Sequence, residues 1–312
     1  MALLGAAAVA QTPSAPAADA WPMPADPQKL QDGPYKDTVL YGRKLFMETY
    51  ATVGPEVKDK EMRYAGNNLS CNNCHLDGGR QRYALPVIGV YGAFPTYMAR
   101  ENEVRTIEER INGCFERSMS GKAIPVGGKE MKALVSYIQF LSLDIPTGKT
   151  PQGRGSPALP MMARAADPKK GQEAFNNYCA ECHGDDGQGM RNGVKGDAKG
   201  YRYPPLWGPD SYNDGAGMHR VIASAGFIRA NMPFGTHYDK PLIAVEEAWD
   251  VAAYINSQER PKMAGLDKDY PNRARKPVDA PFAPYVGNFT PEQHKYGPFR
   301  PMLDAQTAAS PR

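Results

Sequence analysis

A chain of 312 residues with 41% hydrophobic and 23% charged residues has the length of two ordinary domains, each with its own core, and a globular rather than a disordered composition. No apolar run approaches the ~20 residues of a membrane-spanning helix, which excludes a membrane span. The formal net charge of +3 is small, and acidic residues are interspersed among the basic ones, which excludes a nucleic-acid partner.

The N-terminus resembles the end of a secretory signal. Residues 1–11 contain a short apolar stretch with the small-x-small pattern Ala8-Val9-Ala10, although no basic segment precedes it. Residues 11–34 are rich in Pro, Ala and Asp without periodicity, which is typical of a linker. We interpret residues 1–34 as a signal remnant and linker, and we expect a protein exported to the periplasm.

Four of the five cysteines form two copies of one pattern, Cys71-Asn-Asn-Cys74-His75 and Cys179-Ala-Glu-Cys182-His183. This is the covalent attachment signature of c-type haem. Two thiols add to the vinyl groups of one porphyrin, and the adjoining histidine binds the iron. A zinc site would need two further ligands nearby, and a redox disulfide has no use for the histidine. The sequence therefore predicts two covalently bound haem c groups.

The segments around the two motifs repeat as well. Gly42 and Phe46 precede the first motif and Gly171 and Phe175 the second, at a spacing that puts each pair on one helix face. Asp37 and the pair Asp167-Pro168 are candidate helix starts. Downstream, two segments share an aliphatic-x-x-Tyr-Ile pattern on a helical period, ending at 138 and 255.

This pattern resembles the cytochrome c fold, in which the first and last helices cross with a glycine at the contact. We predict an all-α protein with two cytochrome c-like domains in tandem, at residues 35–146 and 167–262. Pro, Gly and Ser recur without periodicity in residues 147–166, which we interpret as a linker. Residues 263–312 are rich in prolines and aromatic residues and are predicted to form an extended tail lying over one or both domains.

In the second domain, Met232 is the candidate for the second axial ligand of the iron. It lies between two predicted helices, 22 residues before the tyrosine of the closing pattern, Tyr254. A thioether ligand favours ferrous iron and raises the reduction potential. Other candidates are two methionines and two histidines, at positions 190, 218, 219 and 237.

The first domain has no second histidine, so its second ligand is chosen among Cys114, Met119, Met98, Met131 and a lysine. Cys114 lies 23 residues before the aligned Tyr137 and Met119 only 18, so the register favours Cys114. A thiolate lowers the potential and is a nucleophile towards sulfur. In the alternative, Cys114 is an inert buried cysteine and Met119 is the ligand.

Four segments together resemble the diheme thiosulfate dehydrogenases, also described as tetrathionate reductases. They are "CNNCHLDGGRQR", "INGCFERSMSGK", "ANMPFGT" and "QHKYGPF", and the similarity runs over residues 33–302. The resemblance implies that two thiosulfates are joined into tetrathionate, or the reverse, at a His75/Cys114 haem. It also implies a His183/Met232 haem that passes electrons on. Some members have a lysine before or in place of the methionine, where this chain has Asn231.

Two dianions must meet in such a site, which requires fixed positive charge. Arg80 and Arg82 follow the first motif, and Arg117 and Ser118 follow Cys114. Guanidinium groups bind sulfonate oxygens in forked geometry, and the Ser118 hydroxyl can donate. We predict that these residues contact the substrate. The alternative for the arginines is pairing with haem propionates.

The electron acceptor is expected to be a small soluble periplasmic protein such as a cytochrome c. Two other functions remain open from the residues. One is a diheme electron-transfer cytochrome without a substrate of its own, which would have no use for Cys114. The other is a sulfur-oxidation cytochrome subunit that acts on a carrier protein.

Overall fold

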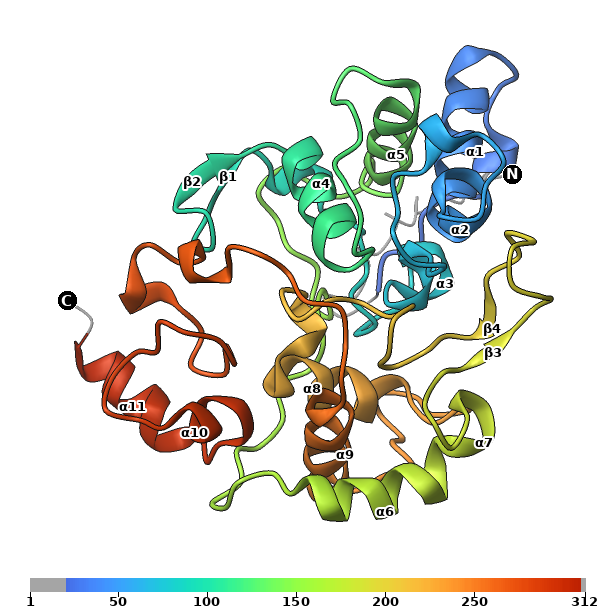
Figure 1. Ribbon diagram of the computed structural model, residues 1–312. Coiled ribbons are helices and arrows are strands. Elements are labelled where there is room, and N and C mark those ends of the chain that lie inside the picture. The colour runs from blue at the N-terminus through green and yellow to red at the C-terminus, as the bar shows by residue number, and fades with distance from the viewer. Residues whose placement is uncertain (1–20, 310–312) are drawn as a thin grey trace, which may run out of the picture.

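The computed structural model describes residues 21–309, which are mainly helical with a few short strands (Figure 1). The N-terminal half carries the first haem motif. Its elements in chain order are α1 (Pro34–Met47), α2 (Thr49–Val53), α3 (Leu76–Gly79), β1 (Thr96–Met98), β2 (Glu103–Arg105), α4 (Ile107–Arg117) and α5 (Lys129–Phe140). β1 and β2 pair antiparallel.

The second half repeats the arrangement around the second motif. Its elements are α6 (Pro168–Tyr178), α7 (Ala180–His183), β3 (Met190–Arg191), β4 (Tyr201–Tyr203), α8 (Val221–Asn231) and α9 (Val245–Ser257). β3 and β4 form a second antiparallel pair. Each half buries its own hydrophobic core. The prediction of two cytochrome c domains in tandem is confirmed.

The first and last helices of each half cross at a glycine. A Cβ atom on Gly42 of α1 would lie 1.9 Å from the carbonyl oxygen of Ala133 in α5. In the second half, a Cβ on Gly171 of α6 would lie 1.9 Å from the carbonyl oxygen of Asp250 in α9. Backbones this close leave no room for any side chain. The predicted crossing is therefore present in both halves.

An aromatic pair packs beside each crossing. Phe46 and Tyr137 have ring centroids 5.6 Å apart, and Phe175 and Tyr254 have centroids 5.4 Å apart. All four residues occupy the positions at which the sequence repeats. The repeat in the sequence is thus a repeat of the same packing unit, in which the tyrosine of the closing helix meets the phenylalanine of the opening one.

The start of one opening helix was predicted correctly and the other was not. Asp167 caps α6 by accepting from the backbone N–H of Lys169, with proline in the first turn. Asp37 does not cap α1, because that helix already begins at Pro34, after Gly33. A proline at the first helical position has no N–H to satisfy, so α1 starts one turn earlier than predicted.

Charged and polar side chains join the two halves. The Asp210 carboxylate accepts from the Asn68 backbone N–H at 2.9 Å and from the Tyr201 hydroxyl at 2.6 Å. Arg191 pairs with Asp210 at 3.1 Å and with Glu56 at 3.0 Å. Because Asn68 and Glu56 belong to the first half and Asp210 and Arg191 to the second, this network fixes the two haem motifs relative to each other.

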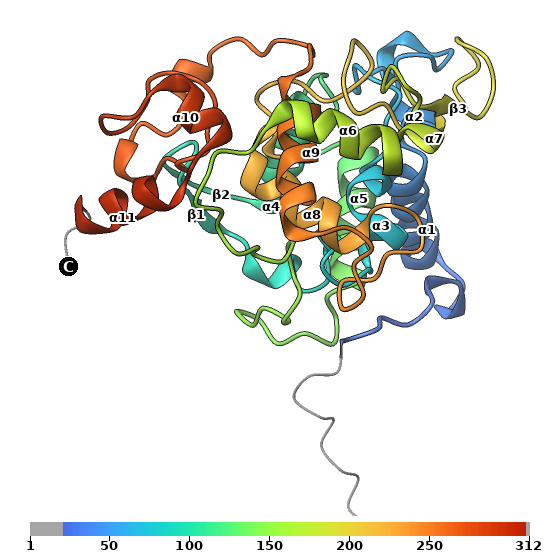
Figure 2. The same cartoon turned by 90° about the horizontal axis from the view of Figure 1, so that it is seen from below.

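The C-terminal tail is only partly extended. It ends in α10 (Pro291–Tyr296) and α11 (Arg300–Ala309), where the prediction had no helix. Thr290 caps α10 and proline occupies its first turn, so the prolines of this tail start helices as well as interrupt them. The two helices lie at one edge of the molecule in both views (Figures 1 and 2), and Phe299 packs against Trp249 of α9.

The predicted leader, residues 1–11, lies outside the described residues. The segment that follows it is seen from residue 21, where the Trp21 indole donates to the carbonyl of Arg80 at 2.8 Å. Among the helices of residues 21–309, none is long and apolar enough to cross a membrane.

We expect the substitutions Gly42→Ala and Gly171→Ala each to destabilise the half that carries them. The added methyl group would collide with a backbone carbonyl, and overpacking of this kind costs about 2–3 kcal/mol or more. Thermal unfolding followed by circular dichroism measures the loss. Gly127→Ala is the matched control, because a Cβ there meets nothing within 4 Å. Equal melting midpoints for all three variants would contradict the close crossing.

Candidate functional site

The first motif is held in place by side-chain hydrogen bonds. Its first turn, Cys71–Asn73, is a 3₁₀ turn in which the side chain of Asn73 accepts from the backbone N–H of Ser70 at 2.6 Å. The Thr49 hydroxyl accepts from the backbone N–H of Cys71 at 3.2 Å. These contacts orient the thiols before any group is attached to them.

Both motif histidines use Nδ1 for a hydrogen bond to a backbone carbonyl, which leaves Nε2 available to bind iron. Nδ1 of His75 donates to the carbonyl of Leu85, and Nδ1 of His183 donates to the carbonyl of Pro204 at 2.8 Å. A carbonyl oxygen only accepts, so the proton is on Nδ1 and Nε2 carries a free lone pair. Burial lowers the pKa of both histidines, which keeps them neutral. Neutral, oriented imidazoles are what axial ligation of haem iron requires.

Three of the motif thiols are kept neutral by burial. Burial raises the pKa of Cys71 to about 12, of Cys74 to about 11 and of Cys179 to about 12. All the cysteines in the part of the chain that the structure describes are free thiols. Each pair is therefore available for thioether attachment and is not closed as a disulfide.

A cavity of about 480 Å³ lies against the second motif. It is lined by the second set of predicted haem residues, Cys179, Cys182, His183 and Met232, and by apolar side chains such as Leu206 and Phe227. The Thr236 hydroxyl also lines it, is buried, and has no hydrogen-bond partner among residues 21–309. The attachment thiols, the two candidate iron ligands, the apolar walls and the unpartnered hydroxyl together fit a haem c.

The first haem motif reaches the same cavity. Cys74, Leu76 and Gln81 belong to its lining, and the amide of Gln81 donates to the side chain of Asn231 at 2.8 Å. Asn231 directly precedes Met232. The two haem sites therefore meet across the boundary between the halves, which suits electron transfer from one to the other.

Cys114 lies on α4, which places an arginine next to its thiol. Thr106 caps this helix, and the side chain of Glu109 accepts from the backbone N–H of Thr106 in return. Arg110 precedes Cys114 by one helical turn, and its Nη1 donates to the sulfur at 2.8 Å. The charge of the Cys114 sulfur raises the pKa of Arg110, so the guanidinium is a permanent cation beside the thiol.

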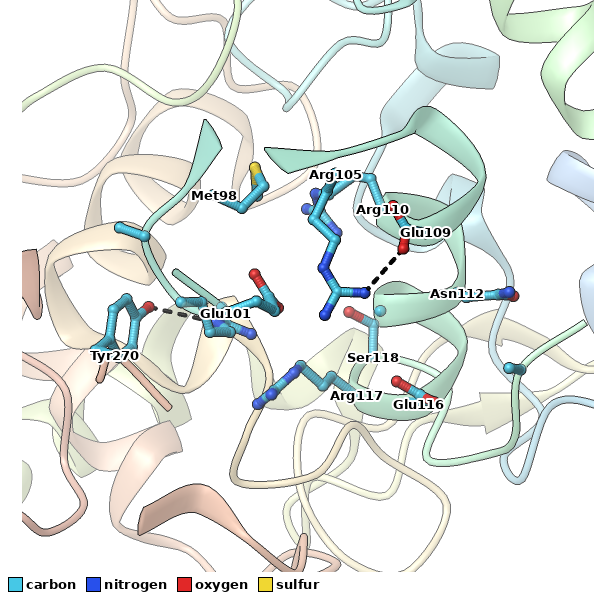
Figure 3. Close-up of a pocket in the computed structure, with 15 residues that line it drawn as sticks. Met98, Glu101, Arg105, Glu109, Arg110, Asn112, Glu116, Arg117, Ser118 and Tyr270 are labelled. Atoms are coloured by element: carbon cyan, nitrogen blue, oxygen red, sulfur yellow. Dashed lines mark hydrogen bonds and ion pairs between the residues drawn. The ribbon is translucent and has the colours of Figure 1, made fainter. Parts of the chain in front are cut away.

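A second cavity, of about 590 Å³, lies along this helix (Figure 3). Its lining contains four arginines and also Ser118 and Tyr270; the arginines are Arg100, Arg105, Arg110 and Arg117. Arg105 pairs with Glu109 at 3.2 Å. Cys114 itself is not part of the lining; Arg110, which donates to its sulfur, connects the thiol to the cavity. The cavity offers several guanidinium groups at once, which is the chemistry that binds oxyanions.

The residues predicted to contact the substrate lie in two different places. Arg117 and Ser118 line the cavity next to Cys114. Arg80 and Arg82 do not: Arg80 pairs with Asp77 at 2.8 Å, and the Arg82 guanidinium donates to the Tyr238 hydroxyl at 3.2 Å. Substrate contact by Arg80 or Arg82 stays a prediction that this geometry does not support.

Three arginines of the cavity were missed from the sequence. Arg110 had a usable signal, since it stands four residues before Cys114 and would share its face if that segment were helical. Arg100 and Arg105 had none, because they lie on and beside the β1–β2 hairpin and reach the cavity only through its fold.

Cys114 and Met119 have different surroundings. The Cys114 sulfur lies near those of Cys71 and Cys74, whose pKa values its charge helps to raise. Met119 is 3% exposed within the core of the first half, and its carbonyl accepts from the backbone N–H of Gly66 at 2.8 Å.

Two family models match the chain. Residues 61–147 match the model described as SoxA/TsdA, cytochrome c domain, and residues 168–259 match the model described as Cytochrome c. Each match contains one of the two haem motifs and the closing helix of its half, and the second match also contains the opening helix α6.

Curated relatives and a solved structure give a more specific similarity. The chain is 37% identical over 246 residues to the thiosulfate dehydrogenase of Stutzerimonas stutzeri (strain A1501), covering 79% of this chain and 75% of that protein. It is 40% identical over 235 residues to the thiosulfate dehydrogenase of Thiomonas intermedia (strain K12), covering 75% and 69%. A structure of the thiosulfate dehydrogenase (TsdBA) from Marichromatium purpuratum matches with a TM-score of 0.69 and 40% identity; the match covers 78% of this chain and 50% of that one.

We expect the double substitution Cys179→Ala with Cys182→Ala to leave one covalently held haem on the chain instead of two. The mass of the denatured protein measures this directly, because only thioether-bound haem survives denaturation. The pair Cys71→Ala with Cys74→Ala should lose the other haem. Cys114→Ser should keep both, and loss of a haem from that variant would contradict the assignment of the attachment cysteines.

Proposed function

The chain belongs to the thiosulfate dehydrogenase family, and we propose that it joins two thiosulfate anions into one tetrathionate in the cavity beside Cys114. It is an oxidoreductase acting on sulfur compounds, and it carries two covalently bound haem c groups. The observation that carries the proposal is the Cys114 thiol, held at 2.8 Å from Arg110 next to a cavity lined by arginines.

The proposed axial ligands are His75 and Cys114 for the first haem and His183 and Met232 for the second. Support comes from the free Nε2 of both histidines and from the cavity that Met232 shares with the second motif. When bound, the haem irons supply the redox centres that take up electrons one at a time. A thiolate ligand gives the first site the lower potential and a thioether gives the second the higher one.

The first task of the protein residues is to bring two dianions together. Thiosulfate anions repel each other, and this repulsion is strong in a site removed from water. Arg100, Arg110 and Arg117 line the cavity as fixed cations, and Ser118 adds a hydroxyl. We assign these residues to the sulfonate oxygens, which leaves the terminal sulfur of each thiosulfate free to react.

Cys114 is the proposed nucleophile, and the guanidinium of Arg110 lies beside its sulfur. The thiolate and the terminal sulfur of one thiosulfate form a sulfur–sulfur bond, and two electrons leave the site. The second thiosulfate then attacks the sulfur bonded to Cys114, breaks that bond and releases tetrathionate and the thiolate. Two thiosulfate dianions thus become one tetrathionate dianion and two electrons, with no proton taken up or released.

The electrons are proposed to leave through the second half. Cys74 and Cys182, one attachment cysteine from each motif, line one cavity, so the path between the haem sites is short. The final acceptor is proposed to be a small periplasmic redox protein such as a cytochrome c, and the reaction is placed in the periplasm.

We expect Cys114→Gly to lower thiosulfate oxidation by at least about a thousandfold, because the nucleophile is removed. Both haems should remain attached. The assay follows bleaching of ferricyanide and formation of tetrathionate. The electron paramagnetic resonance spectrum of the ferric protein should lose its low-spin thiolate signal in this variant.

Met119→Leu is the matched control for that experiment. It conserves the volume of a buried core residue, and it should keep both the thiolate signal and the activity. Full activity in Cys114→Gly, or loss of the first haem's spectrum in Met119→Leu, would remove Cys114 from the chemistry and favour an electron-transfer cytochrome.

We expect Arg110→Gln to lower kcat/KM for thiosulfate by about 10²–10³, since it removes a cation from both the anion and the thiolate. Arg110→Lys should recover part of the loss. Arg300→Gln, an exposed arginine paired only with Asp304 within the C-terminal helix α11, is the control and should match the unmodified protein. An equal loss in both variants would mean that net charge, not the position of Arg110, sets the rate.

A further inference from the structure

The C-terminal tail completes the anion cavity of the first half. The backbone N–H of Tyr270 donates to the carbonyl of Arg100 at 2.7 Å, and the Tyr270 ring, 6% exposed, lines the cavity. The Tyr270 hydroxyl, which carries a dashed line in Figure 3, accepts a hydrogen bond from Arg100 Nε at 3.3 Å. A segment 170 residues downstream of Arg100 thus forms one wall.

The residue before this tyrosine, Asp269, holds Arg117 in a two-point ion pair. Arg117 Nη1 donates to one carboxylate oxygen at 2.8 Å, and Nη2 donates to the other at 2.7 Å. The Arg117 and Asp269 side chains are 12% and 9% exposed. A forked pair removed from water in this way is rigid and strong, so Asp269 fixes where the Arg117 guanidinium points.

The geometry of this pair decides which edge of Arg117 remains available. The carboxylate of Asp269 accepts from the two terminal nitrogens of the guanidinium, Nη1 and Nη2. The carbonyl of Gly215 also accepts from Nη1, at 3.3 Å. The adjacent edge, formed by Nε–H and the second N–H of Nη2, has no acceptor among residues 21–309. Because Arg117 lines the cavity, this edge is left to donate to an anion there.

Asp269 acts on a second arginine through its charge. Its carboxylate lies 3.9 Å from Arg100 Nε, while Arg273 donates to the Asp269 backbone carbonyl at 2.6 Å and holds the segment in place. Asp269 is not part of the cavity lining. Asp269 lies behind Arg100 and Arg117 as seen from the cavity. An anion in the cavity would therefore contact the arginines directly, and Asp269 would act on it by offsetting their positive charge.

The remaining charges of the cavity are already partly balanced. Arg105 pairs with Glu109 at 3.2 Å and with Glu103 at 3.1 Å, and Arg110 faces Cys114. Two further carboxylates, Glu101 and Glu116, also line the cavity. The charges that Asp269 itself opposes are those of Arg117, at 2.7 Å, and of Arg100, at 3.9 Å.

We propose that Asp269 is a positioning residue that sets the anion affinity of the cavity: it aims Arg117 and offsets its charge, so that binding stays weak enough for the product to leave. This rests on the proposed function, in which two dianions enter and one dianion of equal charge must depart. A site with two unopposed arginines would hold that product too tightly for rapid turnover.

The test is Asp269→Asn, with sulfate as a non-reacting dianion. Asparagine keeps the size and one hydrogen bond to Arg117 but removes the negative charge. Sulfate binding to the ferric diheme protein, measured by titration calorimetry, should tighten by about tenfold. In thiosulfate oxidation, KM and kcat should both fall. A purely structural role for Asp269 predicts the opposite sign, because a loosened Arg117 binds anions less well.

Asp304→Asn is the matched control. It removes one carboxylate from the same tail, at an exposed pair with Arg300, and should leave sulfate affinity unchanged. If Asp269→Asn lowers the haem content or the melting midpoint, the titration is repeated on Arg117→Gln, which should weaken sulfate binding by at least about tenfold.

The outcomes separate this inference from the proposed function. Unchanged or weaker sulfate binding in Asp269→Asn, or unchanged binding in Arg117→Gln, overturns the role of Asp269. So does an unmodified protein that binds no sulfate. The calorimetry needs no turnover, so a protein that binds sulfate as described but does not oxidise thiosulfate would overturn the proposed function and leave the role of Asp269 standing.

Discussion

The structure depends on two close backbone crossings, at Gly42 over Ala133 and at Gly171 over Asp250. Each crossing lets the opening and closing helices of one half touch without an intervening side chain, which sets the angle at which the rest of the chain leaves them. Phe46 and Phe175 then pack against the tyrosines of the closing helices. This shared geometry places a haem motif at the same position in both halves, and in both halves the proposed second axial ligand comes from the segment before the closing helix.

The two halves differ in what they present to the iron and in what surrounds it. The second half encloses its motif in a largely apolar cavity with Met232 in its wall, which suits an electron-transfer centre. In the first half the proposed counterpart of that methionine is Cys114 on α4, and the β1–β2 hairpin lies beside this helix. Arg110, one turn before Cys114, donates to its sulfur. We propose that one fold supports a chemical site and an electron exit in this way, and the Asp210 network joins the two halves.

In the first half, the positive charges of the cavity arginines are offset by neighbouring groups. Arginines gather where dianions must meet, but each is opposed: Arg105 by Glu109, Arg110 by the Cys114 sulfur, and Arg117 by Asp269. The opposing group of Arg117 comes from the C-terminal tail, which packs mainly on the second half. The tail thus links the anion site to the half that carries electrons away. Such balance suits an enzyme whose substrates and product carry the same charge.

The sequence by itself determined the two haem motifs, the helix crossings and the candidate Cys114, because each depends on local spacing: attachment needs Cys-x-x-Cys-His, and a helix repeats every 3.6 residues. Arg117 and Ser118 were found for the same reason, as near neighbours of Cys114. Only the tertiary structure decided the other walls of the anion cavity. Arg100 comes from a hairpin, and Asp269 and Tyr270 from a tail about 150 residues away, while Arg80 and Arg82, close to the motif in sequence, point elsewhere. Charged residues that come together only on folding show no periodic pattern in the sequence, because their contact depends on how distant segments pack.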